Sequence, residues 1–336
     1  MRENPALMHR PVAVGGSPEH RGVISTCNYP ARREGVHSAM ASRTALRLCP
    51  DLLILPHRMA LYRDVSQQLG KILGQYSDVI EPLSLDEAYL DVTGSSRYSG
   101  SATRTAEAIR EHVCRELGIK VSAGVAGNKF LAKVASDWRK PDGLYVVEPC
   151  RADEFIQTLP VARIPGVGKV MQQRLAELGV TECGQLQRFS QVALSEKFGS
   201  FGLRLYALCR GQDERPVSCE RIRKSLSVEH TYVQDIFSQQ GCEAVLPELC
   251  LRLQTRLKHL DNSCRVSKAF VKVKFTDFTQ TTLERGNIGW NVGSFQVLLR
   301  EALQRHSGGV RLLGVGVRFA VTESAKQMLL FDSISL

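Results

Sequence analysis

Several features that would place this chain among membrane, secreted or zinc-binding proteins are missing from its 336 residues. No apolar run approaches the roughly 20 residues of a membrane-spanning helix, and the start at Met1 carries no signal-peptide core. The ten cysteines form no Cys-x-x-Cys pair, and the eight histidines form no His-Glu-x-x-His motif. We therefore expect a soluble cytoplasmic protein whose cysteines are reduced and mostly buried, rather than zinc-bound or paired in disulfides.

Acidic residues are too few to balance the basic ones. The chain has 44 Lys and Arg against 34 Asp and Glu, a formal charge of +10 at pH 7. An excess of cations attracts polyanions, so the expected partner is nucleic acid or an anionic membrane surface. The hydrophobic content of 43% is ordinary for a globular protein, and the length allows two to four domains.

Two adjacent carboxylates, Asp86 and Glu87, stand between two segments that alternate like β-strands, residues 79–85 and 88–92. We expect them at the tip of an antiparallel hairpin, because neighbouring side chains on a flat strand point to opposite faces. Paired carboxylates supply the hard oxygen ligands that suit Mg²⁺. The alternative is a solvated Asp-Glu turn without function.

The segment around this hairpin has an α/β pattern. Apolar residues recur at helical spacing over residues 106–117, and Gly118 can end that helix. We expect a strand near 121–125, a helix opened by Asn128 and a strand at 144–147. This alternation predicts a single sheet covered by helices.

Residues 149 to about 213 have the pattern of short helices with a turn, Ile164 to Lys169, between two of them. This is the helix-hairpin-helix pattern, in which Gly166 and Gly168 let backbone amides approach a phosphate and Lys169 adds charge. Contact to phosphates would be independent of sequence. A plain Gly-Pro turn is the alternative.

After residue 216 the order strand, helix, strand, strand, helix, strand is expected, which resembles a ferredoxin-like unit. Its elements are expected at 221–231, 241–260, 266–276, 279–284, 293–306 and 310–321. Two strands have one apolar and one basic or hydroxyl face, which carries Arg221 and Arg223 on the first strand and Lys272 and Lys274 on the other. Lys224 adds a further charge to the first strand. Such a face suits a phosphate backbone, although solvated strands often carry lysine too.

The C-terminal segment Lys326 to Phe331 places apolar side chains at a loose end. Such an end suggests a partner surface, and a frayed strand that packs back on its own domain is the alternative.

In combination and in this order, the motifs resemble a Y-family translesion DNA polymerase of the bacterial DinB type over nearly the whole chain. The motifs that carry the resemblance are Gly22 to Arg32, Ser84 to Tyr89, Lys129 to Asp137 leading to Lys140-Pro141, Ile164 to Lys169, and Arg221 to Ser225. The resemblance implies an α+β multidomain fold, the right-hand polymerase. Its parts would be fingers at 1–56, an α/β palm at 57–148, a helical thumb with the helix-hairpin-helix at 149–213, a ferredoxin-like βαββαβ little finger at 221–325, and a tail at 326–336.

The resemblance also implies roles for particular residues. Asp86 would bind the catalytic Mg²⁺ and Glu87 would assist the metal and the attacking 3′-hydroxyl, with two ions in the intact family site. The incoming triphosphate would be held by Ser25, Thr26, Tyr29, Arg32 and Lys140. In the tail, Gln327, Leu330 and Phe331 would anchor a sliding clamp. The implied partners are primer-template DNA, deoxynucleoside triphosphates and the clamp, for a monomer without a membrane partner.

One part of the family pattern has no match. The family chain begins with a strand carrying Asp-x-Asp-Cys-Phe, which supplies the first metal-binding aspartate and a gate against ribonucleotides. Here, Met1 to Leu7 matches the family residues directly after that strand, and neither Glu3 nor Asp91 is an obvious substitute. Either the sequence is clipped upstream, which we expect, or the chain starts at Met1 and is a crippled polymerase.

Three functions therefore remain open. The leading hypothesis is a template-directed, low-fidelity DNA polymerase for translesion synthesis. The second is a DNA-binding and clamp-binding protein without catalysis, which needs the helix-hairpin-helix, the basic strands and the tail but not the carboxylates. The third is a metal-dependent nuclease that uses Asp86 and Glu87.

Overall fold

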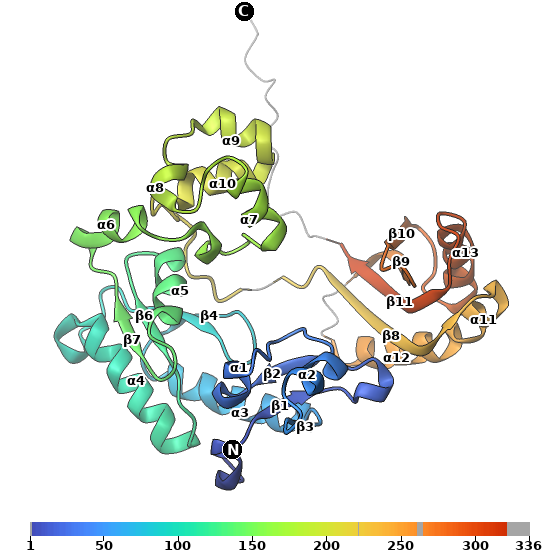
Figure 1. Cartoon of the computed structure of the whole chain (residues 1–336), viewed down its shortest axis with the longest axis horizontal. Coiled ribbons are helices and arrows are strands. Elements are labelled where there is room, and N and C mark those ends of the chain that lie inside the picture. Colours follow the sequence, from blue (N-terminus) through green and yellow to red (C-terminus); the bar gives the residue numbers. More distant parts are fainter. Residues whose placement is uncertain (1, 221, 261–264, 321–336) are drawn as a thin grey trace, which may run out of the picture. The chain divides into compact units, whose positions relative to one another are not determined.

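The computed structural model describes residues 2–220, 222–260 and 265–320 (Figure 1). Its residues divide into two compact units. One consists of residues 3–57 together with the residues from 222 onward, and the other consists of the described part of 58–221.

The N-terminal part of the first unit is a small sheet with two short helices. The strands lie in the order β2-β1-β3, with β1 antiparallel to β2 and parallel to β3. The elements are β1 (Val12–Gly15), β2 (Ile24–Cys27), α1 (Tyr29–Arg33), α2 (Ser42–Leu48) and β3 (Leu53–Leu55). Ala13, Ile24, Ala31 and Ala45 are almost fully buried and form its core.

The C-terminal part of the first unit has the predicted βαββαβ order of elements. Its four strands pair antiparallel in the order β10-β9-β11-β8, and three helices cover one face of the sheet (Figure 1). The elements are β8 (Ser225–Ile236), α11 (Gln239–Ala244), α12 (Leu246–Lys258), β9 (Val266–Phe275), β10 (Gln280–Gly286), α13 (Val292–Leu303) and β11 (Val310–Phe319).

Two boundaries in this part differ from the sequence prediction. The single helix expected at 241–260 is two helices, because Pro247 stands at the start of α12, where a proline begins a helix easily. The first strand begins at Ser225 rather than 221, so Ile222 is 61% exposed instead of sharing the buried face of Leu226 and Val228. The inward positions of β9, Val271, Val273 and Phe275, are buried as predicted.

The first half of the second unit contains two strand pairs and three helices. Strand β4 (Val79–Pro82) pairs antiparallel with β5 (Ala88–Asp91), and β6 (Ala123–Val125) pairs parallel with β7 (Leu144–Val146). The helices are α3 (Met59–Leu73), α4 (Ala102–Leu117) and α5 (Lys129–Trp138). The single covered sheet that we expected is wrong for the described residues, because no described strand lies between the two pairs and joins them.

Short helices make up the second half of this unit, as predicted. They are α6 (Ala152–Gln157), α7 (Lys169–Ala176), α8 (Cys183–Leu186), α9 (Gln191–Phe198) and α10 (Ser200–Leu208). Their core is continuous with α5, since Phe130 and Val134 belong to the same buried cluster as Ile156 and Leu175. The helices and the strand pair β6-β7 are therefore held by shared burial of apolar side chains.

The described residues also bear on two expectations, which concern membrane-spanning helices and the state of the cysteines. None of their helices is both long and apolar enough to cross a membrane. Of the nine described cysteines, all are free and six are buried, which agrees with the expectation of reduced, mostly buried thiols. Burial raises the pKa of Cys183 to about 12, so this thiol stays protonated and unreactive near neutral pH.

Candidate active site and nucleic-acid interface

Asp86 and Glu87 lie in the connection of the β4-β5 hairpin, so the predicted antiparallel hairpin is confirmed. The Glu87 carbonyl closes the connection by accepting hydrogen bonds from the Leu83 and Ser84 amides at 2.9 and 3.3 Å. Asp86 is exposed and accepts a 2.6 Å hydrogen bond from the Ser84 hydroxyl. The tight turn keeps the two carboxylates on one short loop.

The Glu87 carboxylate has a cationic partner. Lys133 of α5 donates to Glu87 Oε1 at 2.6 Å, and the two side chains are 26% and 41% exposed. Among the described residues, no group of three or more His, Cys, Asp or Glu side chains could hold a metal ion. Two carboxylates can hold a cation only if its remaining ligands come from water and substrate phosphates, which is how Mg²⁺ is usually bound.

A second lysine lies one helical turn before Lys133. Residues four apart share a face of a helix, and Lys129 pairs with Glu81 of β4 as Lys133 pairs with Glu87. The Lys129 side chain is only 9% exposed, and its ammonium lies 5.2 Å from the centre of the Tyr89 ring. Neither lysine had a predicted role, although two lysines four residues apart within a predicted helix were the available signal.

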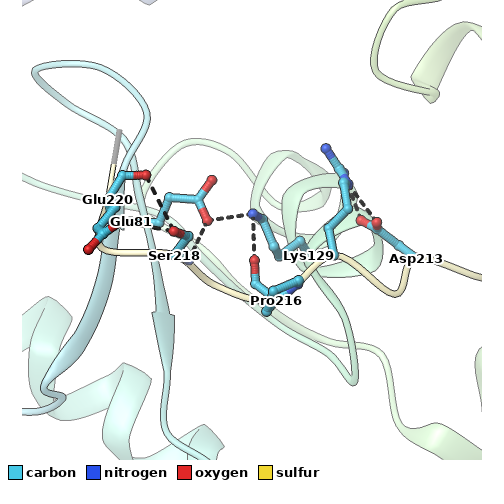
Figure 2. A network of polar contacts seen from close by, with 7 residues as sticks. Glu81, Lys129, Asp213, Pro216, Ser218 and Glu220 are labelled. Carbon is cyan, nitrogen blue, oxygen red and sulfur yellow. Dashed lines mark hydrogen bonds and ion pairs between the residues drawn. The ribbon is translucent and has the colours of Figure 1, made fainter. Parts of the chain in front are cut away.

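Lys129 and Glu81 also bind the segment that follows the thumb-like helices (Figure 2). Lys129 donates to the Pro216 carbonyl at 3.1 Å, and the Ser218 amide donates to Glu81 at 2.9 Å. Further along, Arg215 forms a bidentate pair with Asp213 at 2.6 and 2.7 Å. Residues 213–218 are thus attached to the hairpin and to α5 by charged and backbone contacts.

The pKa of Glu81 reflects this network. Burial raises it, but the hydrogen bonds from Lys129 and from the Ser218 amide outweigh burial and hold the pKa below its ordinary value of 4.5. Asp213 behaves in the same way, since burial raises its pKa and Arg215 more than compensates. Both carboxylates are therefore ionised at neutral pH and bind their partners as charges.

Four of the five residues expected at the triphosphate gather at the junction of β2 and α1. Ser25 and Thr26 are exposed on β2, and the Ser25 hydroxyl lies 2.5 Å from His57 Nε2. Tyr29 begins α1 and is 44% exposed, and the Arg32 guanidinium lies 6.0 Å from its ring centre. Asn28 caps the helix by accepting from the Ala31 amide.

The fifth residue, Lys140, belongs to the other unit. It is exposed and forms an ion pair with Asp137, three residues earlier. The four N-terminal residues therefore lie together, whereas Lys140 is paired with Asp137 of its own unit.

The predicted hairpin between helices is present at residues 164–168, before α7. Gly166 has φ +100°, which favours glycine, and a Cβ there would approach the Phe201 ring to 2.9 Å. Gly168 precedes the first residue of α7, Lys169, and both of these residues are exposed. The turn therefore presents glycine backbone and one lysine to solvent.

The basic residues of the C-terminal sheet are not equivalent. Lys272 binds both carboxylate oxygens of Glu229 at 3.0 and 2.9 Å, whereas Lys274 forms no ion pair with any described residue. Arg223 and Lys224 are exposed in the extended segment before β8. Arg221 and the clamp-binding candidates Gln327, Leu330 and Phe331 lie outside the described residues.

Comparison with known families covers most of the chain. Residues 1–137 match the impB/mucB/samB family, residues 162–213 match the thumb domain of DNA polymerase-iota, and residues 223–330 match the impB/mucB/samB C-terminal domain. A solved Y-family DNA polymerase chimera of Dbh and Dpo4 aligns with a TM-score of 0.83 at 27% identity, covering 94% of this chain and 93% of that one. DinB from Sulfolobus solfataricus aligns with a TM-score of 0.63 at 27% identity, covering 95% of this chain and 94% of that one. The fold is that of a Y-family DNA polymerase.

Curated relatives show which group of Y-family polymerases the chain resembles. DNA polymerase IV of Pseudomonas putida (strain GB-1) is 55% identical over 98% of this chain and 93% of its own length. DNA polymerase IV of Ectopseudomonas mendocina (strain ymp) is 55% identical over 95% of this chain and 90% of its own length. The chain belongs to the DNA polymerase IV (DinB) group of the Y-family of translesion DNA polymerases. Its enzyme class is DNA-directed DNA polymerase, which implies dependence on a divalent metal ion.

Proposed function

We propose that this chain extends a DNA primer past damaged template bases by adding deoxynucleotides, with Mg²⁺ held by Asp86 and Glu87. The observation that carries the proposal is the pair of adjacent carboxylates on the short β4-β5 connection, in a chain 55% identical to DNA polymerase IV. Two carboxylates with the substrate's phosphates make a set of oxygen ligands suited to Mg²⁺. The bound metal would neutralise charge on the phosphate oxygens as phosphoryl transfer proceeds.

The chain's own residues would bind and orient the nucleotide. The hydroxyls of Ser25, Thr26 and Tyr29 can each donate a hydrogen bond to a phosphate oxygen, and Arg32 can hold two oxygens in its fork. Lys140 would add a point charge once it exchanges Asp137 for a phosphate. In this proposal residues 1–56 are the fingers and residues 57–148 the palm.

Other parts of the chain would hold primer-template DNA. The thumb, residues 149–213, would contact phosphates through the backbone at Gly166 and Gly168 and through Lys169. The little finger, residues 221–325, would use five of its basic residues, Arg221, Arg223, Lys224, Lys272 and Lys274. The proposal includes a cytoplasmic monomer whose tail, residues 326–336, binds a sliding clamp.

A second candidate is a DNA-binding and clamp-binding protein without polymerase activity. It is favoured by one observation: among the described residues, no third carboxylate joins Asp86 and Glu87. DNA binding through the thumb and little finger would not need it.

Primer extension with purified protein separates the two candidates. The assay is run on the 336-residue chain and on the same chain preceded by a family-type first strand with its aspartate, with DNA binding measured in parallel. The polymerase proposal expects extension at least in the completed form and its loss in Asp86→Ala, while DNA binding is retained. Asp91→Ala is the matched control, because Asp91 ends the same hairpin and binds the Thr93 amide. Binding without extension in both forms would favour the second candidate, and undiminished extension in Asp86→Ala would refute the site.

A further inference from the structure

Phe278 is an exposed aromatic residue in a backbone conformation that suits it poorly. It lies in the turn between β9 and β10, has φ +70° and is 60% exposed. The turn is closed by backbone hydrogen bonds, with the Phe275 amide donating to the Thr279 carbonyl at 2.9 Å. Positions with positive φ usually hold glycine or asparagine, so the turn itself gives no reason for a phenylalanine. A bulky residue kept in such a conformation suggests a role for its side chain.

Two cations lie against the Phe278 ring. The Lys274 ammonium and the Arg311 guanidinium are each 4.8 Å from the ring centre. Within the described residues neither forms an ion pair, unlike four other cations on strands of the same sheet. Those paired cations are Lys268 and Arg318, both bound to Glu284, Lys272, bound to Glu229, and Arg285, bound to Glu301.

The acidic residues near this turn are already engaged. Asp277 accepts from the Thr279 amide and hydroxyl and lies 3.0 Å from His306 Nε2. Asp235 pairs with Arg21 at 2.5 Å. The positive charges of Lys274 and Arg311 are therefore available to bind an external anion.

A second exposed phenylalanine lies at the same end of the sheet, where Ile236, Val310 and Phe275 are paired across the strands. Phe237 directly follows β8 and is 81% exposed. A Cβ placed on Gly309 would approach its ring to 2.7 Å, and Gly309 is two residues before Arg311. The aromatic-cation surface thus consists of Phe237, Phe278, Lys274 and Arg311.

Single-stranded DNA has the chemistry that this surface would recognise. Each nucleotide offers a flat base and a phosphate, and proteins bind single strands by stacking bases on aromatic rings within a basic groove. In a duplex the faces of the bases are covered by their neighbours, so only an unpaired base can stack on a protein ring. Lys274 and Arg311 have long rotatable side chains, so either can leave the ring for a phosphate while a base takes its place.

We propose that the aromatic-cation surface binds the unpaired template strand, with Phe278 stacking on a base and Lys274 and Arg311 holding adjacent phosphates. This inference rests on the proposed function, because a polymerase works on a duplex that continues into a single template strand. It adds a site for the strand that has not yet been copied.

The test measures how tightly the full chain binds two different primer-templates. One has a 5′ template overhang of thymidines, and the other has an overhang of abasic nucleotides with the same phosphates. Fluorescence anisotropy at fixed salt gives the two dissociation constants. The wild type is expected to bind the thymidine overhang about tenfold more tightly, within the range measured for base stacking on aromatic side chains.

Phe278→Asn removes the ring and suits the positive φ, so the fold should be retained. In this variant the preference for the thymidine overhang should disappear, while Phe278→Tyr should keep it. Tyr98→Asn is the matched control, since Tyr98 is 43% exposed with φ +51° in the other unit. Its preference should equal that of the wild type.

The outcomes separate this inference from the proposed function. Equal affinity of the wild type for the two overhangs, or an unchanged preference in Phe278→Asn, overturns the inference and leaves duplex binding intact. If the wild type binds neither DNA, the proposed function fails, and the inference fails with it.

Discussion

Neighbouring lysines on one strand can differ in whether their positive charge is available to bind a ligand. Lys272 and Lys274 lie two residues apart on β9. Lys272 forms an ion pair with Glu229, whereas Lys274 forms no ion pair with a described residue. For Lys274→Ala we expect weaker DNA binding for all sequences and a salt slope reduced by about one, because one phosphate contact is lost. The measurement is DNA affinity across a salt series.

Lys272→Ala serves as the comparison, and a smaller effect is expected because Lys272 would first have to leave Glu229. A larger loss in Lys272→Ala than in Lys274→Ala would contradict this ranking of the two lysines.

The sequence predicted the positions of single residues better than their partners. Alternation around Asp86 and Glu87 was enough to place them in a hairpin connection. Nothing local indicated that Lys133 would bind Glu87 from 46 residues away, or that Glu229 would bind Lys272 from 43 residues away. Such pairs depend on tertiary packing, which propensity and periodicity do not encode.

At the scale of structural elements, two glycines of the helix-hairpin-helix turn allow a test of its backbone conformation. Gly166 has φ +100° and lies against Phe201, whereas Gly168 has φ −82° and open space around its Cβ position. Gly166→Ala should lower the free energy of unfolding by about 1–3 kcal/mol, through strain and the clash. Urea unfolding measures the change.

Gly168→Ala is the matched control and should change stability by less than about 1 kcal/mol. Equal losses in the two variants would mean that the conformation of Gly166 is not what the turn requires.

The segment that leaves the thumb-like helices is attached through one buried lysine. Lys129→Met removes the cation that Glu81 and the Pro216 carbonyl share, and leaves a half-buried carboxylate without it. We expect a loss of about 2–3 kcal/mol in unfolding free energy and faster cleavage after the exposed Glu214 by a glutamate-specific protease. Lys133→Met is the control, because its partner Glu87 is 41% exposed and the pair should contribute less than about 1 kcal/mol. An equal loss in both variants would contradict the account.

The same network should respond to acid. The pKa of Glu81 is lowered in the folded chain, so its contribution is present above 4.5 and is lost as pH falls through the lowered value. Glu81→Gln should therefore be less stable than the wild type at pH 6, and the difference should shrink below pH 4.5. Urea unfolding at a series of pH values measures it. A difference that grows on acidification would contradict the assigned direction.

Helices and strands with strong local signals could be predicted, and their assembly into sheets could not. The helix over residues 106–117 ends at Gly118 with φ +62°, as the apolar spacing and the glycine indicated. The single sheet expected over residues 57–148 is two separate pairs in the described residues, β4-β5 and β6-β7. Sheet assembly depends on which edges meet, and short strands of three or four residues carry little information about that.

At the scale of the whole molecule, the net charge follows directly from the sequence. The formal charge of +10 predicts that DNA binding weakens steeply with salt, since bound phosphates release counterions. We expect at least a tenfold loss of affinity between 50 and 200 mM salt, roughly what several phosphate contacts produce. An affinity that does not change over this range would exclude the basic surfaces as the DNA-binding sites.

The proposed polymerase activity depends most on the two carboxylates of the β4-β5 connection. The direct measurement is a crystal structure of the chain with primer-template DNA, Mg²⁺ and a non-hydrolysable deoxynucleotide. We predict a Mg²⁺ ion within about 2.0–2.1 Å of Asp86 and Glu87 oxygens and of the triphosphate. A triphosphate bound elsewhere, with Asp86 and Glu87 pointing apart and no ion between them, would contradict the assignment.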